Sequence, residues 1–196
     1  MQKEKMNHIR LEKKGIRGLA IAESFRETDL TSSLAGIVMR RDFIIDGFIF
    51  GKATIRGDDA TNKIISMYEK LNRQDISFVL ISGLVISMYN IVDMKKLWKE
   101  MKVPIIGVTY EESDGLEEAI KRHFHDSYES KIEQYQKLGP RIKISLHTKH
   151  DLYLRVEGCE IKEAKKLLDA FTLQGAIPEP LRVAQLLAKA ELDLAS

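Results

Sequence analysis

The sequence predicts one α/β domain over residues 1–196, built on a five-stranded mixed sheet. Three apolar segments that suit strands come first, and a helical period begins at Ala60. After that point compact apolar segments alternate with amphipathic ones, as strands alternate with helices in α/β folds. The 196 residues, of which 44% are hydrophobic and 31% are charged, are enough to bury a core.

The first three predicted strands span residues 15–23, 33–40 and 43–55. The third is rich in aromatic and β-branched residues, and Gly47 and Gly51 mark sites for bulges. Only a short charged turn separates the second strand from the third. We therefore expect these two strands to pair as an antiparallel hairpin.

Helices and strands then alternate. Asp58 or Asp59 can cap a first helix, whose apolar residues from Ala60 to Leu71 recur at helical spacing. A compact strand over 77–81 leads to a second helix that Asp93 can cap. A further apolar strand over 103–109 completes the predicted sheet.

The helices after this strand have recognisable ends. The pattern Asp114-x-x-Glu117 predicts a capping box, with Leu116, Ile120 and Phe124 facing inward. A further helix, with Ile132 and Tyr135 inward, should end at Gly139-Pro140.

The last part of the chain predicts a hairpin and two helices packed on the core. Apolar residues alternate over 142–146 and 152–156 around a polar link, which is typical of a half-exposed hairpin. A helix over 161–171 follows, and Pro178-Glu179-Pro180 favours the start of the last one. In that last helix the predicted inward residues are Val183, Ala184, Leu187 and Ala190.

The order of elements is that of an RNase H-like core over 15–140, with 141–196 packed on it. Three sequential strands precede the alternation, whereas a doubly wound fold alternates from its first strand. The prediction therefore distinguishes between two α/β architectures that share the same element types.

Composition limits the function classes. A net charge of +2 provides no global field for nucleic acid, and the basic run over 1–17 suits either a solvated terminus or a phosphate-binding arm. The single cysteine, Cys159, excludes an intramolecular disulfide and fits a reducing cytoplasmic setting. With no apolar run of about 18 residues and no signal-peptide pattern, we expect no membrane segment.

Acidic residues stand where an RNase H-like sheet holds metal. In such a sheet the acids come from the first strand, the junction before the first helix and the end of the fourth strand, and Mg²⁺ or Mn²⁺ prefers oxygen ligands. Candidate metal ligands are therefore Glu23, Asp58, Asp59 and Asp93, with Glu23 and Asp59 as candidate catalytic carboxylates. The alternative role for Asp59 and Asp93 is that of helix caps only.

Nearby residues fit contacts with nucleic acid. Arg56 could hold phosphate or replace a metal ion electrostatically, and Tyr89-Asn90 forms a polar and aromatic loop that could stack on a base. A core position for Tyr89 is the alternative. Ala22 and Ser82 occupy two places where the metal site needs acids.

Other residue patterns give weaker indications of chemistry. The pairs His123/His125 and His147/His150 lack the further ligands that a zinc site needs. Cys159 has no neighbouring group that would activate a thiolate.

Short motifs in order along nearly the whole chain resemble the archaeal endonuclease dU family, formerly a domain of unknown function and related to endonuclease V. They are Gly15-Ile16-Arg17, Ile21-Ala22-Glu23-Ser24-Phe25, Gly36-Ile37-Val38-Met39-Arg40, Ile45-Asp46-Gly47-Phe48, Gly57-Asp58-Asp59-Ala60-Thr61, Tyr89-Asn90-Ile91-Val92-Asp93, Val103-Pro104-Ile105-Ile106 and Pro178-Glu179-Pro180-Leu181-Arg182-Val183-Ala184. The resemblance implies an RNase H-like core and, for active members, divalent-metal cleavage of DNA with deaminated bases, a repair activity.

The chain departs from the family pattern at acidic positions. The pattern has paired aspartates at Ala22-Glu23, an aspartate at Arg56 and often one at Ser82, whereas Asp59 and Asp93 match it. Two hypotheses follow: a metal-dependent endonuclease that uses Glu23 and Asp59, or a catalytically inactive paralogue that binds nucleic acid or protein. Both hypotheses allow DNA or RNA as the partner, and both allow a homo-oligomer.

Overall fold

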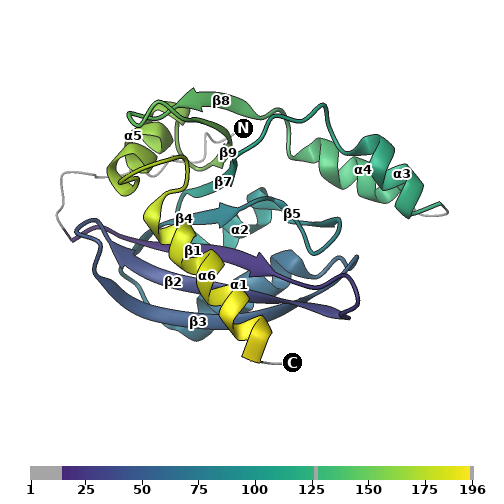
Figure 1. The fold of residues 1–196 in the computed structure, drawn as a ribbon, viewed down its shortest axis with the longest axis horizontal. Helices are drawn as coiled ribbons and strands as arrows, with labels where there is room; N and C mark the ends of the chain where they lie inside the picture. The colour runs from purple at the N-terminus through teal and green to yellow at the C-terminus, as the bar shows by residue number, and fades with distance from the viewer. Residues whose placement is uncertain (1–14, 126–127, 195–196) are drawn as a thin grey trace.

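A seven-stranded mixed sheet runs through the computed structural model, which describes residues 15–125 and 128–194 (Figure 1). The strand order is β3-β2-β1-β4-β7-β9-β8. The strands are β1 Arg17–Ser24, β2 Thr31–Arg40, β3 Ile45–Thr54, β4 Ile76–Ser82, β7 Ile105–Thr109, β8 Ile142–Ser145 and β9 Asp151–Glu157. The three central strands β1, β4 and β7 are parallel, and the remaining pairs are antiparallel.

The predicted five strands are wrong in number because the C-terminal hairpin joins the sheet. Strand β9 pairs antiparallel with β7, from Ile105 opposite Glu157 to Thr109 opposite Tyr153. Strand β8 pairs with β9 in turn. Pairing covers the edge of β7 that would otherwise expose unpaired backbone groups. Segment 141–196 therefore contributes to the central sheet as well as packing on it.

The predicted hairpin of the second and third strands is confirmed. The register shifts between Val38 opposite Gly47 and Met39 opposite Ile45, so a bulge occurs beside Gly47 as expected. Gly51 pairs regularly with Leu34 and is not a bulge. A Cβ on Gly51 would lie 2.6 Å from the sulfur of Met67, so this glycine allows close approach of a helix.

Helices cover both faces of the sheet. They are α1 Ala60–Leu71, α2 Met94–Met101, α3 Glu117–His123, α4 Tyr128–Lys137, α5 Ile161–Phe171 and α6 Glu179–Leu194. On one face α1 and α2 bury Ile64 and Leu97 against Leu19 and Ile21. The other core contains Ala20 and Ala22 together with buried residues of α5 and α6. Alternating residues of β1 thus serve opposite layers.

Two helix predictions need correction. Helix α3 begins at Glu117 after Leu116 without a side-chain cap, so the predicted capping box at Asp114 does not form. In α6 the buried face includes Ala184 as expected but continues through Ala188 and Leu192, while Ala190 is exposed. Val183 and Leu187 are partly buried against the same core, so only Ala190 departs from the prediction.

Helices α3 and α4, here called the α3–α4 arm, lie to one side of the sheet (Figure 1). A small apolar cluster joins Ile120 and Tyr135 of the arm to Ile91. Below the arm is a short hairpin that the sequence did not predict, β5 Val85–Ile86 with β6 Asn90–Ile91. Of the helices in the described ranges, none has both the length and the hydropathy needed to cross a membrane. The basic run before position 15 lies outside the described residues.

Candidate functional site

The β5–β6 hairpin connects the candidate acidic residues. We call Glu23, Asp58, Asp59 and Asp93 the acidic corner. Glu23 lies near the end of β1, Asp58 and Asp59 lie between β3 and α1, and Asp93 lies between β6 and α2. Residues 87–90 contact the carboxylates of Glu23 and Asp59 directly, and they are linked to Asp58 through Lys131. The structure therefore gathers elements that are far apart in the sequence at one end of the sheet.

Glu23 is held by Ser87. Its carboxylate accepts hydrogen bonds from the Ser87 backbone N–H at 2.8 Å and from the Ser87 hydroxyl at 2.8 Å. Burial raises the pKa of Glu23 above its ordinary value of 4.5, and the Ser87 bonds counteract only part of that effect. Ala22 faces the opposite core, as strand alternation predicts. Glu23 therefore binds a proton more readily than an exposed glutamate, and Ser87 already donates to both oxygens that a metal ion would need.

Glu23→Gln should raise stability relative to wild type as pH increases. A folded pKa above 4.5 means that wild type gains stability from this group below about pH 4.5 and loses it as pH rises through the folded pKa. Glutamine stays neutral, so the difference in free energy of unfolding, variant minus wild type, should grow from pH 4 toward pH 8. Urea titrations across this range measure it. A difference that is constant with pH would contradict the raised pKa.

Asp59 is held by the residues before its helix and by β6. It accepts hydrogen bonds from the Thr54 N–H at 3.0 Å, the Thr54 hydroxyl at 2.8 Å and the Asn90 amide at 2.8 Å. Burial raises its pKa, but these bonds and the Lys63 charge outweigh burial, so the pKa of Asp59 lies below its ordinary value. Asp59 is thus an ionised carboxylate with protein donors already in place.

The cap of α1 comes from Asn90. Asp59 occupies the N-cap position, but its side chain makes no capping bond. Instead the Asn90 side-chain oxygen accepts from the Ala60 N–H at 3.0 Å, while its amide donates to Asp59 and to the Thr54 carbonyl at 2.9 Å. The prediction that Asp58 or Asp59 caps this helix is therefore wrong. Asn90 is fully buried, which places it away from nucleic acid.

Asp58 is paired with a lysine from the arm. Its carboxylate lies 2.5 Å from the Lys131 ammonium, which also donates to the carbonyls of Gly57 at 2.5 Å and Tyr89 at 3.0 Å. The side chain of Lys131 is only 5% exposed, whereas that of Asp58 is 63% exposed. This contact could not be predicted, since Lys131 resembles any other lysine of an amphipathic helix.

Asp93 and Arg56 have local roles. Asp93 caps α2, because its side chain accepts from the Lys96 N–H at 3.0 Å, and this predicted cap is confirmed. Arg56 adopts φ 59° and donates its backbone N–H to the Ser87 carbonyl at 2.7 Å. A role of the Arg56 side chain in binding phosphate remains a prediction.

The turn of the hairpin is unusual. Ser87, Met88 and Tyr89 have φ of 47°, 54° and 74°, although none is glycine. Successive non-glycine residues in this region are strained, and such strain persists where surrounding contacts fix it. Here the Ser87 bonds to Glu23 and the packing of Tyr89 against His123 and Phe124 fix the turn. Tyr89 therefore lies in a partly buried aromatic cluster, and its stacking on a base stays a prediction.

The acidic corner does not fit a divalent metal ion. Within residues 15–125 and 128–194 no three His, Cys, Asp or Glu side chains form a group that could hold one. The Glu23, Asp58 and Asp59 carboxylates have protein donors, and Ser82, at the place of a further acid, accepts from Gln185 at 2.9 Å. His123, His125, His147 and His150 likewise form no such group, and burial raises the pKa of Cys159 to about 12, which opposes a thiolate.

Comparison with known proteins shows the family of this chain. The model of the family described as endonuclease dU matches residues 14–191. The chain belongs to the endonuclease dU family. A UPF0215 protein of Pyrobaculum aerophilum is 38% identical over 173 residues, which cover 88% of this chain and 92% of that protein.

Solved structures agree with the fold of this endonuclease dU family member. A protein of unknown function from Archaeoglobus fulgidus is similar with a TM-score of 0.78 and 28% identity, over 90% of this chain and 98% of that one. Ciona intestinalis endonuclease V, in complex with DNA that contains an inosine, has a TM-score of 0.61 and 14% identity, over 95% of this chain and 89% of that one. The second likeness concerns the fold alone.

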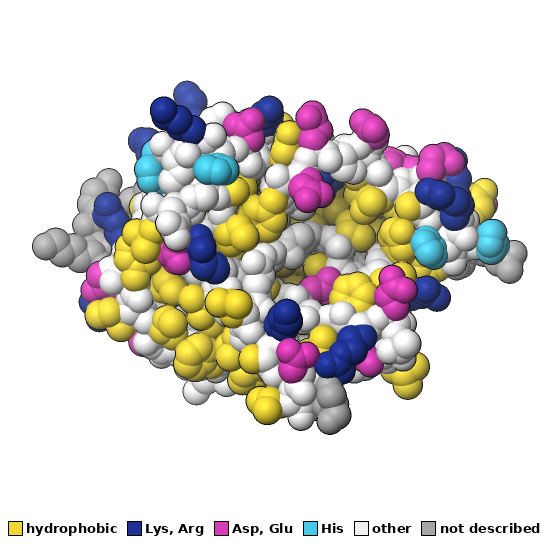
Figure 2. Space-filling model, viewed as in Figure 1, with side chains coloured by type: hydrophobic (Ala, Val, Ile, Leu, Met, Phe, Trp, Pro, Cys, Tyr) yellow, Lys and Arg dark blue, Asp and Glu magenta, His cyan; other side chains and the backbone are white. Residues whose placement is uncertain are grey.

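A pocket of this endonuclease dU family member opens at the same end of the sheet as the acidic corner. It has a volume of about 390 Å³ and lies at the ends of β4 and β7, between the sheet and the arm. Its lining includes Gly83, Tyr110, Leu116, Tyr135 and Arg141. Figure 2 shows this face hollowed between the part that carries the arm and the main sheet. Pocket formation was not predicted from the sequence.

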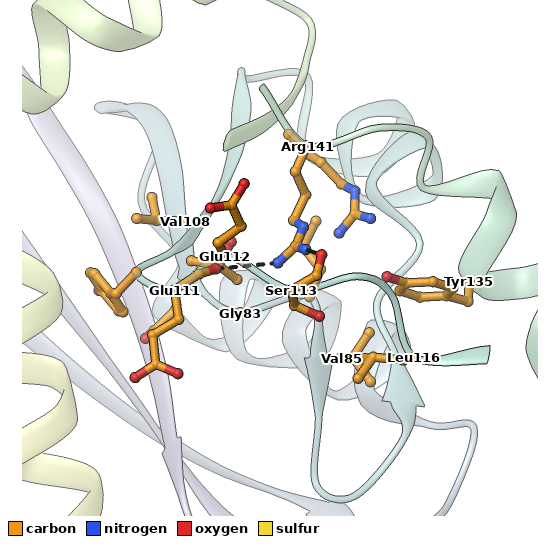
Figure 3. A pocket seen from close by; sticks show the side chains of 14 residues that line it. Gly83, Val85, Val108, Glu111, Glu112, Ser113, Leu116, Tyr135 and Arg141 are labelled. Atoms are coloured by element: carbon orange, nitrogen blue, oxygen red, sulfur yellow. Dashed lines mark hydrogen bonds between the residues drawn. The ribbon is translucent and has the colours of Figure 1, made fainter. Parts of the chain in front are cut away.

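Arg141 borders the pocket in a fixed position. Its guanidinium donates to the carbonyls of Glu111 at 3.4 Å and Ser113, as Figure 3 shows. Leu116 and Tyr135 approach from the arm side in the same view. Gly83 has φ 81°, so the backbone conformation at this edge favours glycine. The pocket thus combines apolar, aromatic and cationic groups with the acidic side chains of Glu111 and Glu112.

Proposed function

We propose that this endonuclease dU family member binds nucleic acid containing a deaminated base and accepts that base in the pocket. The observation that carries the proposal is the position of the pocket, outside the carboxyl ends of the adjacent parallel strands β4 and β7. Ligands of open α/β sheets bind at such ends. Aromatic and apolar walls with a few polar groups suit a planar heterocycle.

We further propose an RNase H-like core whose metal-dependent cleavage is lost. The order β3-β2-β1-β4-β7, with the first three strands antiparallel, supports this interpretation of the fold. Loss of cleavage is supported by the protein donors that Glu23, Asp58 and Asp59 already have, from Ser87, Lys131 and Thr54. The inactive nucleic-acid-binding paralogue is therefore the alternative that these contacts favour.

Metal-dependent cleavage is the second candidate function. Glu23 and Asp59 are both anchored to the β5–β6 hairpin, through Ser87 and Asn90, at the same end of the sheet. If these carboxylates exchanged their protein donors for Mg²⁺ or Mn²⁺, an activated water could attack a phosphodiester. Cleavage that requires Mg²⁺ or Mn²⁺ and is lost in Glu23→Gln would favour this candidate over the first.

Binding assays with labelled DNA or RNA test the first candidate. Pure protein in EDTA should bind oligonucleotides with uracil or hypoxanthine in DNA, or hypoxanthine in RNA, more tightly than undamaged ones, and affinity should fall as salt rises. With Mg²⁺ or Mn²⁺ at protein excess, the strands should remain intact.

Leu116→Trp should fill the pocket and weaken the affinity for the modified base about tenfold. That factor corresponds to roughly 1.4 kcal/mol of binding free energy. Leu173→Trp is the matched control, because Leu173 is 61% exposed and does not line the pocket. Absence of binding at low salt, or equal preference in wild type and Leu116→Trp, would contradict recognition in the pocket.

A further inference from the structure

The buried ammonium of Lys131 enters the acidic corner from the α3–α4 arm. Its three oxygen neighbours are the carbonyls of Gly57 and Tyr89 and the carboxylate of Asp58, at 2.5, 3.0 and 2.5 Å. A lysine ammonium has three donors and no acceptor. All its donors therefore have partners within the protein.

These contacts compensate a charge that burial would otherwise disfavour. A buried charge is costly unless it is paired and hydrogen-bonded. Lys131 has the Asp58 carboxylate as counter-ion, and its ammonium also lies 5.4 Å from the centre of the Phe124 ring. By contrast, Lys63 is 49% exposed and its ammonium lies 3.9 Å from the Asp59 carboxylate, so water solvates it.

We infer that Lys131 is the resident cation of the acidic corner and takes the place that a divalent ion would need beside Asp58. An ammonium there repels a second cation and uses the oxygen atoms that would coordinate it. Arg56 was the residue expected to replace a metal ion electrostatically, whereas the contacts assign that role to Lys131. The inference deepens the proposed function, because it explains why binding should not need metal.

Lys131 also positions one wall of the pocket. Tyr135 follows it by one turn in α4 and lines the pocket, as does Leu116 at the start of α3. The bonds of Lys131 to Gly57 and Tyr89 tie this arm to the junction before α1 and to the hairpin turn. One side chain thus neutralises Asp58 and holds the pocket wall.

Nuclear magnetic resonance of the intact protein can observe this cation directly. The Lys131 NH₃⁺ group should give a ¹⁵N signal protected from water exchange, whereas that of Lys63 should exchange rapidly. Asp58→Asn should remove or shift the Lys131 signal without unfolding the protein, because the Asp58 side chain is 63% exposed. A Lys131 signal that exchanges as rapidly as that of Lys63, or that Asp58→Asn leaves unchanged, would overturn the inference.

Paramagnetic Mn²⁺ provides the second measurement. In wild type, Mn²⁺ at protein concentration should leave the backbone signals of residues 57–59 and 89 unbroadened. In Lys131→Ala it should broaden them, and Lys131→Ala/Asp58→Asn should abolish that broadening. Broadening in wild type, or its absence in folded Lys131→Ala, would overturn the inference. If Lys131→Ala does not fold, the wild-type result and Asp58→Asn still decide.

These measurements use no nucleic acid, so their failure is separable from failure of the proposed function. If the protein excludes Mn²⁺ but binds no oligonucleotide, the role of Lys131 as resident cation stands and only the proposed function fails. If the protein binds a modified base yet takes up Mn²⁺ at residues 57–59, the proposed function stands and only the inference about Lys131 fails.

Discussion

Asn90→Ala is expected to lower the free energy of unfolding by about 2–4 kcal/mol, because an unpaired buried polar group costs about 1–3 kcal/mol. The fully buried Asn90 side chain accepts from the Ala60 N–H and donates to the Thr54 carbonyl and the Asp59 carboxylate. Alanine removes all these bonds and the cap of α1 together. Urea denaturation followed by circular dichroism measures the loss.

Two further variants make this prediction specific. Asn90→Asp keeps an acceptor for the Ala60 N–H but removes both donated bonds and places a carboxylate beside Asp59, so it should destabilise at least as much as alanine at neutral pH. Asn62→Ala is the control, since exposed Asn62 only accepts from Lys96, and its cost should stay within about 0.5 kcal/mol. Equal costs for Asn90→Ala and Asn62→Ala would contradict the capping role.

Local patterns determine much of the fold, and pairing between distant segments determines the rest. The three antiparallel strands, the alternation that follows and the Asp93 cap each depend on neighbouring residues, so periodicity finds them. The pairing of β9 with β7 depends on the free edge of β7. The sequence around β9 does not predict this pairing, because β7 lies far from β9 along the chain. The β5–β6 hairpin has strands of two residues and a turn of non-glycine residues, so it lacks the usual turn signals.

The candidate site shows the same division. Sequence analysis located Glu23, Asp58 and Asp59 at the ends of the correct elements. Their partners could not be predicted, because Ser87, Lys131 and Asn90 are 64, 73 and 31 residues away from them respectively. Whether a carboxylate binds metal, caps a helix or pairs with an ammonium depends on these partners. The residue type at the end of a strand therefore indicates a site without specifying its chemistry.

Phe171→Ala is expected to destabilise the whole chain by about 3–5 kcal/mol, as truncation of a buried phenylalanine usually does. Phe171 ends α5 and is fully buried. Its ring makes edge-to-face contacts with Phe78 of β4 at 5.4 Å and Phe43 at 6.3 Å between ring centres. Alanine would leave a cavity between the C-terminal segment and the central sheet. Urea titration monitored by circular dichroism measures the change.

The same variant tests whether 141–196 folds as one domain with the rest of the chain. Trp98, the single tryptophan, lies on α2 and is partly buried against the core on the other face of the sheet. If the sheet couples both faces, Phe171→Ala should shift the Trp98 fluorescence transition and the circular dichroism transition together. Leu173→Ala, at a position 61% exposed, should shift neither by more than about 0.5 kcal/mol. A fluorescence transition that Phe171→Ala leaves in place would show that the two segments unfold separately, despite the pairing of β9 with β7.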